Sequence, residues 1–76
     1  MLILYTKNNC PFCEKAKKAF LERGVGYEER NIGDDAYFEE AKEKGIKSVP
    51  YLVDTTANLT MADSERIIDY ISECAF

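Results

Sequence analysis

The chain has 76 residues and a formal net charge of −4, so we expect one domain over residues 1–76 that does not bind nucleic acid. No apolar run approaches the roughly 20 residues of a membrane span, so no membrane partner is expected either. Histidine is absent, which excludes Cys–His nucleophilic catalysis, Ser–His–Asp triads and the usual zinc ligand sets.

The motif Cys10-Pro11-Phe12-Cys13 lies where a predicted strand passes into a predicted helix. An apolar run at residues 2–5 predicts the strand, and residues 14–24 have the pattern of the helix. Proline is favoured at the first helical position, which makes Cys10 the N-cap residue. The amides of Phe12 and Cys13 should then point at its sulfur. Cys13 lies one turn further along, within disulfide reach of Cys10.

This placement predicts thiol–disulfide chemistry. The thiolate is the reactive form of cysteine, and a helix N-terminus or a nearby cation lowers the pKa of a thiol. We therefore predict that Cys10, with Lys7 three residues before it, is the attacking sulfur and that Cys13 is the resolving sulfur. A buried structural C-x-x-C or half of a metal site is the alternative, but a C-x-x-C beside a β–α junction is typical of redox proteins.

The cysteine count also indicates a compartment. Three cysteines, two of them in one C-x-x-C, do not make a disulfide framework and suit the reducing cytosol. The first five residues lack the basic lead and cleavage site of a secretory signal, so we expect a cytoplasmic protein. The third cysteine, Cys74, is predicted to be a small buried residue, with a regulatory or dimerising role as the alternative.

The rest of the chain predicts three more strands and two more helices. Residues 25–32 form a polar strand with Tyr27 and Ile32 as apolar anchors, which is typical of a sheet edge. The other expected elements are a helix at 34–44, strands at 51–54 and 59–61, and a helix at 63–73. The residues expected to face the core from these two helices are Tyr37, Phe38, Ala41, Ile67, Ile68, Ile71 and Cys74.

The predicted order is β-α-β-α-β-β-α, which indicates the α/β class. The first two strands are joined by a helix and should be parallel, with a right-handed crossover. The last two strands should form a hairpin. We therefore expect a four-stranded mixed sheet with three helices distributed over both faces.

Three stretches together resemble the glutaredoxins. They are Cys10-Pro11-Phe12-Cys13 after a strand, Ser48-Val49-Pro50 before a strand, and Met61-Ala62-Asp63-Ser64 opening the last helix. The resemblance covers essentially the whole chain and implies the thioredoxin-like fold of that family. Thr60 and Met61 stand where many glutaredoxins have two glycines, and the M-x-D-S pattern is more similar to the N-terminal domain of glutathione transferases.

The resemblance implies a glutathione site. It implies a cis peptide bond before Pro50, with the backbone of Val49 holding the cysteinyl part of glutathione. A proline that merely starts a strand is the alternative. Asp63 and Ser64 would hold the γ-glutamyl end at the start of the last helix, or would only cap that helix.

Three further residues are candidates for the same site. Lys7 matches a lysine that, in the family, favours the thiolate and binds the glycyl carboxylate, and its alternative is a solvated loop lysine. Lys47 is a second candidate for that carboxylate. Phe12 could flank the bound peptide.

The function implied is a glutathione-dependent thiol–disulfide oxidoreductase that reduces protein disulfides or glutathione mixed disulfides. Glutathione would be the co-substrate, and no metal is expected. The partners would be disulfide-bonded or glutathionylated proteins, and the protein itself is expected to be a monomer. One alternative is a hydrogen donor to ribonucleotide reductase, fed by thioredoxin reductase. The others are an iron–sulfur cluster carrier and a binding module without catalysis.

Overall fold

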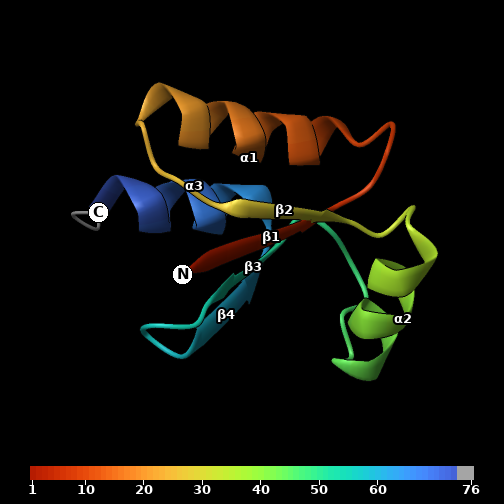
Figure 1. Ribbon diagram of the computed structural model, residues 1–76. Helices are drawn as coiled ribbons and strands as arrows, with labels where there is room; N and C mark the ends of the chain where they lie inside the picture. The colour runs from red at the N-terminus through yellow and green to blue at the C-terminus, as the bar shows by residue number, and fades with distance from the viewer. Residues whose placement is uncertain (74–76) are drawn as a thin grey trace.

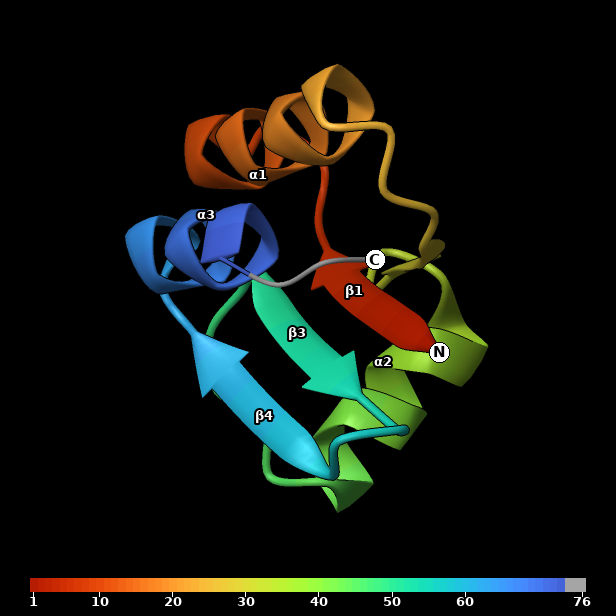
Figure 2. The ribbon, with the colours of Figure 1, turned by 90° about the vertical axis from the view of Figure 1, so that its left-hand side faces the viewer.

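The computed structural model describes residues 1–73. Its elements are β1 (Leu2–Thr6), α1 (Pro11–Glu22), β2 (Glu28–Asn31), α2 (Asp35–Glu43), β3 (Tyr51–Asp54), β4 (Leu59–Ala62) and α3 (Ser64–Glu73). The strands lie in the order β2-β1-β3-β4, with β1 parallel to β2 and the other two pairs antiparallel. Figures 1 and 2 show α1 and α3 on one face of the sheet and α2 on the other. The predicted order and the mixed four-stranded sheet are confirmed.

The larger part of the core lies between the sheet and helices α1 and α3. Alternate residues of a strand face opposite sides of a sheet, so Leu2 and Leu4 of β1 face these two helices. The buried residues of α1 are Cys13, Ala16, Ala19 and Phe20. The buried apolar cluster on this face comprises Leu2, Leu4, Ala16, Ala19, Phe20, Leu52, Ile67 and Ile71. This packing anchors α1, and with it the C-x-x-C motif at its start, on the sheet.

Helix α2 covers the opposite face with a smaller contact. Ala41 is its buried residue and packs with Ile3 and Tyr5 of β1. The prediction that Phe38 also packs inward is wrong, since this side chain is 50% exposed. The reason is the ion pair between Arg30 of β2 and Glu40 of α2. This ion pair turns a partly polar face of α2 toward the sheet.

Several element boundaries differ from the predicted ones. Helix α1 begins at Pro11 and ends at Glu22, and Gly24 follows it with a φ of +65°. The amide of Gly24 donates to the Leu21 carbonyl and that of Val25 to the Phe20 carbonyl, which is the Schellman arrangement. Because this motif occupies the residues after the helix, β2 is four residues long rather than eight.

Two further predictions concern Cys74 and a membrane-spanning helix. Cys74, which we expected on the inner face of the last helix, lies outside the described residues. Within residues 1–73, no helix is long and apolar enough to cross a membrane.

Candidate active site

The two cysteines of the C-x-x-C motif lie at the start of α1, as predicted. Cys10 is the N-cap residue, with extended torsions of −117° and 97°, and Pro11 is the first residue of the helix. The Cys13 amide donates a hydrogen bond to the Cys10 sulfur at 3.1 Å. The Glu14 amide donates to the Cys10 carbonyl at 3.0 Å. Of the two amides predicted to contact the sulfur, the one that does so is that of Cys13.

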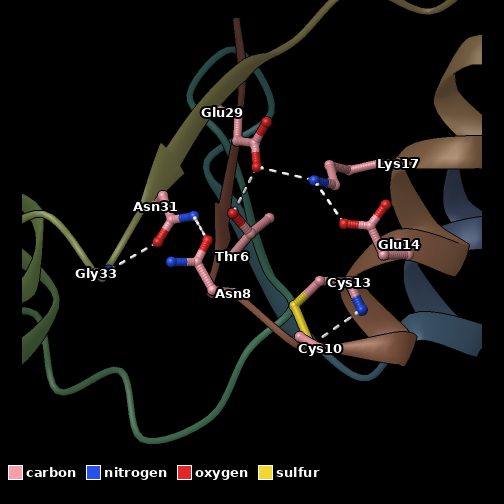
Figure 3. Close-up of polar contacts among 9 residues, drawn as sticks. All are labelled: Thr6, Asn8, Cys10, Cys13, Glu14, Lys17, Glu29, Asn31 and Gly33. Atoms are coloured by element: carbon pink, nitrogen blue, oxygen red, sulfur yellow. Dashed lines mark hydrogen bonds and ion pairs between the residues drawn. A yellow bond between two sulfur atoms is a disulfide. The ribbon is translucent and has the colours of Figure 1, made fainter.

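Cys10 and Cys13 are joined by a disulfide (Figure 3). Their Cα atoms are 5.2 Å apart, which is an ordinary separation for a bridged pair. The two residues differ in accessibility, because Cys10 is 5% exposed and Cys13 is completely buried. A thiol approaching from solvent therefore meets Cys10 first.

A groove of about 340 Å³ lies beside the disulfide. It is lined by Phe12, Ser48, Val49, Pro50, Ala62, Asp63, Ser64 and Glu65. The peptide bond between Val49 and Pro50 is cis, as the resemblance implied. Three segments far apart in the sequence thus meet here: the start of α1, the loop before β3 and the start of α3.

The structure brings together five of the seven residues predicted to bind glutathione. Phe12, Val49, Pro50, Asp63 and Ser64 line the groove. Phe12 is 64% exposed, so an aromatic face is open to a ligand next to the disulfide.

The two predicted lysines are placed differently. Lys7 and Lys47 are exposed and are not part of the groove lining. The lining residues that carry a charge, Asp63 and Glu65, are both acidic. The groove wall itself therefore offers no cation to a carboxylate, which the sequence had led us to expect from Lys7.

Asp63 and Ser64 occupy the start of α3. The Asp63 carboxylate accepts the Glu65 amide at 3.1 Å, and the Asp63 carbonyl accepts the Ile67 amide at 3.0 Å. Asp63 thus caps the helix, with a φ of +104°. Ser64 is buried at the first helical position. Helix capping is the alternative that the sequence analysis left open for Asp63 and Ser64. Capping does not remove these residues from the lining of the groove.

Glu65 is a groove residue that sequence reasoning missed. Its carboxylate is ion-paired with Lys15 of α1, so this ion pair links α1 to the start of α3. Both side chains are more than half exposed, and such pairs contribute little to stability. No local signal could have found this contact, because the two residues are 50 positions apart.

A polar network joins β1, α1 and the edge strand β2 (Figure 3). The Thr6 hydroxyl, completely buried at the end of β1, donates to the Glu29 carboxylate at 2.7 Å. Lys17 of α1 contacts Glu29 at 3.2 Å and Glu14 at 2.9 Å. The contact with Glu29 holds Lys17 against β2, and its side chain is 25% exposed.

The network shifts the ionisation of its members. Burial by itself raises the pKa of Glu29, but the hydrogen bonds from Thr6 and Lys17 outweigh it, and the pKa is lower than usual. The pKa of Lys17 is raised, chiefly by its hydrogen bond to Glu14. Both groups are therefore held in their charged forms. Among residues 1–73, no cluster of three or more cysteine or acidic side chains could hold a metal ion.

Comparison with known proteins identifies the family and the relatives that the chain resembles. The family model described as glutaredoxin matches residues 2–55. Glutaredoxin 1 of Rickettsia conorii is 44% identical over 46 residues, which are 60% of this chain and 43% of that protein, so the chain spans less than half the length of that relative. The glutaredoxin-like protein NrdH of Lactococcus lactis subsp. lactis is 34% identical over 53 residues, which are 68% of this chain and 74% of the relative.

A solved structure supports the fold. The glutaredoxin-like protein NrdH-redoxin from Escherichia coli superposes with a TM-score of 0.78 over 97% of both chains, at 21% identity. At that identity the likeness shows the thioredoxin-like fold, and the family rests on the sequence matches. The chain therefore belongs to the glutaredoxin family, and the C-x-x-C disulfide at the start of α1 is its redox-active disulfide.

Proposed function

We propose that the protein is a glutathione-dependent thiol–disulfide oxidoreductase that reduces protein disulfides or glutathione mixed disulfides. The observation that carries this proposal is the position of the Cys10–Cys13 disulfide at a helix N-terminus, where Phe12, between the two cysteines, lines a groove of about 340 Å³. The membership of the glutaredoxin family supports the same chemistry.

The proposed cycle starts from the reduced protein. The Cys10 thiolate attacks one sulfur of a substrate disulfide, whose S–S bond breaks, and the other substrate sulfur leaves as a thiolate that takes a proton from solvent. The Cys13 thiolate then attacks the Cys10 sulfur, releases the second substrate thiolate and regenerates the Cys10–Cys13 disulfide. Two glutathione molecules reduce this disulfide in two further exchanges and leave as oxidised glutathione.

Cys10 is the proposed attacking sulfur for two reasons. It is the more exposed of the two, and its sulfur accepts a hydrogen bond from the helix N-terminus. Such hydrogen bonds favour a thiolate. Cys13, buried inside the first turn, can reach the Cys10 sulfur and not a substrate in solution.

The groove is the proposed binding site of glutathione. The backbone of Val49 would pair with the cysteinyl part as an added strand does. The start of α3, with Asp63 and Ser64, would meet the charged γ-glutamyl end. Lys7 and Lys47, exposed outside the groove lining, would reach the glycyl carboxylate through their long side chains.

The test uses one substitution at each cysteine. With glutathione, its reductase and a small glutathione mixed disulfide, Cys10→Ser should have no activity, because the attacking thiolate is gone. Cys13→Ser should retain activity on that substrate, since glutathione can resolve the mixed disulfide, but should lose the reduction of protein disulfides. Activity retained by Cys10→Ser would contradict the proposed roles.

A second candidate is a hydrogen donor fed by thioredoxin reductase, acting for example on ribonucleotide reductase. The relationship to the glutaredoxin-like protein NrdH favours it, as does a groove lining whose charged residues, Asp63 and Glu65, offer no cation to the carboxylates of glutathione. The same protein-disulfide substrate should be assayed with glutathione plus its reductase and, separately, with thioredoxin reductase. If the substrate is reduced with thioredoxin reductase and not with glutathione plus its reductase, the second candidate replaces the first.

A further inference from the structure

We propose that Asn31 is a positioning residue for Cys10. Asn31 touches neither sulfur. It acts through Asn8, in the loop that leads from β1 to the N-cap cysteine. The inference rests on the proposed role of Cys10 as the attacking sulfur, and it concerns how the fold holds that sulfur in place.

The edge strand β2 presents Asn31 to the active-site side of the sheet. Residues two apart in a strand share a face, so Asn31 lies on the same face as Glu29. Glu29 contacts Thr6 and Lys17, so this face points toward α1 and the loop before it. Arg30, between them, contacts Glu40 of α2 on the opposite face. Figure 3 shows Asn31 and Asn8 side by side at the end of β2.

Both ends of the Asn31 amide are engaged. Its Nδ2 donates to Asn8 Oδ1 at 3.0 Å, and its Oδ1 accepts the Gly33 amide at 2.7 Å. A Cβ atom at residue 33 would lie only 2.9 Å from the Asn31 Oδ1, so glycine is the residue that leaves room for this side chain. The orientation of the Asn31 amide is therefore set by the turn after β2, and Asn8 is held to it.

The loop from Thr6 to Cys10 has little freedom left once Asn8 is held. Thr6 is paired with Asn31 in the parallel ladder, and the Thr6 carbonyl accepts the Ile32 amide at 2.8 Å. Asn9 adopts a left-handed φ of +54° and delivers the chain to Cys10. The sulfur of Cys10 receives the Cys13 amide only when Cys10 keeps its non-helical torsions. Releasing Asn8 lets the loop adopt conformations in which the sulfur does not cap the helix and its thiolate is less stabilised.

Uncharged substitutions can test the tether. Asn8→Ala, Asn31→Ala and the double variant leave every charged group of the protein unchanged, among them Lys7, Glu14, Lys17 and Glu29 near the loop. The reduced proteins should be alkylated with iodoacetamide, a neutral reagent, near pH 6.5 and near pH 9.5. Peptide fragmentation in the mass spectrometer should identify the modified cysteine, because Cys10 and Cys13 lie on one tryptic peptide. Circular dichroism and thermal melting should accompany each measurement, to confirm that the variants are folded.

Asn8→Ala should slow the alkylation of Cys10 about two- to tenfold near pH 6.5, the range expected for one lost hydrogen bond. Near pH 9.5, where the thiol ionises without help, the rates should converge. The alkylation of Cys10 should slow by at least as much in Asn31→Ala. In the double variant, this alkylation should be no slower than in the slower of the two single variants. A change in access rather than in thiolate stability would instead slow alkylation equally at both pH values, and that result would overturn the proposal.

A pair of glycine variants provides a matched control. Gly33→Ala should push Asn31 aside and slow alkylation near pH 6.5 as Asn8→Ala does. Gly26→Ala should not slow alkylation, because a Cβ atom at residue 26 meets nothing within 4 Å. Equal rates for Asn8→Ala and the parent protein, with both folded, would refute the tether. Alkylation at Cys13 in place of Cys10 would refute the attacking role of Cys10 as well. Alkylation requires no glutathione, so a failed glutathione assay would leave the tether result standing.

Discussion

The replacement Thr6→Val removes a single buried hydroxyl from the polar network that joins β1, β2 and α1. Thr6 is completely buried, and its hydroxyl donates to Glu29 at 2.7 Å. A hydrogen bond to a charged group contributes about 1.5–3 kcal/mol. The Glu29 side chain is 36% exposed and keeps Lys17, so water can replace part of the lost bond. We therefore expect the free energy of unfolding to fall by about 1 kcal/mol, or the melting temperature by about 4–8 °C.

The same variant should change the dependence of stability on pH. The pKa of Glu29 is lowered in the folded protein, against the effect of burial, by Thr6 and Lys17. A carboxyl group whose pKa falls on folding stabilises the protein above its unfolded pKa of about 4.3, and that contribution is lost as the pH falls through the folded pKa. The difference in stability between Thr6→Val and the parent should therefore shrink between about pH 5 and about pH 3.

Urea unfolding of the oxidised proteins, followed by circular dichroism near pH 7 and near pH 3.5, measures both effects. Thr60→Val is the matched control, because it makes the same change at an exposed position of β4 and should alter stability by less than about 0.5 kcal/mol. Equal stability of Thr6→Val and the parent near pH 7 would refute the reasoning. So would a deficit of the same size at both pH values.

Four further variants test the packing, the helix end and one surface ion pair by thermal or urea unfolding. Phe20→Ala should cost about 3–5 kcal/mol, because Phe20 is completely buried, while Leu21→Ala, at a side chain 81% exposed, should cost little; similar losses would contradict the assigned core. Gly24→Ala should cost about 1 kcal/mol, because this residue ends α1 with a φ of +65°, and an unchanged midpoint would contradict that conformation. Lys15→Met should cost less than about 1 kcal/mol, with a smaller loss at high salt, since its pair with Glu65 is exposed; a loss that salt does not reduce would contradict an ionic origin.

Local patterns predicted most of the fold. Strand β3 has its predicted bounds, and Cys10 occupies the predicted N-cap position of α1, because caps and apolar runs depend on residues close together in the sequence. The inward packing of Phe38 was wrong for the opposite reason. Its exposure depends on Arg30, a residue of another element that pairs with α2.

The candidate site divides in the same way. The motifs predicted five of the groove residues, among them Phe12 and Pro50, because each lies in a recognisable local pattern. They could not place Lys7 and Lys47, since the reach of an exposed lysine depends on the course of its loop. The roles of all these residues toward glutathione stay predictions.

The sequence by itself determined the order of the elements, the place of the two cysteines at a helix start and the family. Those features depend on neighbouring residues, whose spacing can be seen along the chain. Only the tertiary structure decided which distant side chains meet, such as Thr6 with Glu29 and Asn8 with Asn31. The parallel pairing of β1 with β2 brings these residues together across more than 20 intervening positions, and no pattern along the chain specifies such a contact in advance.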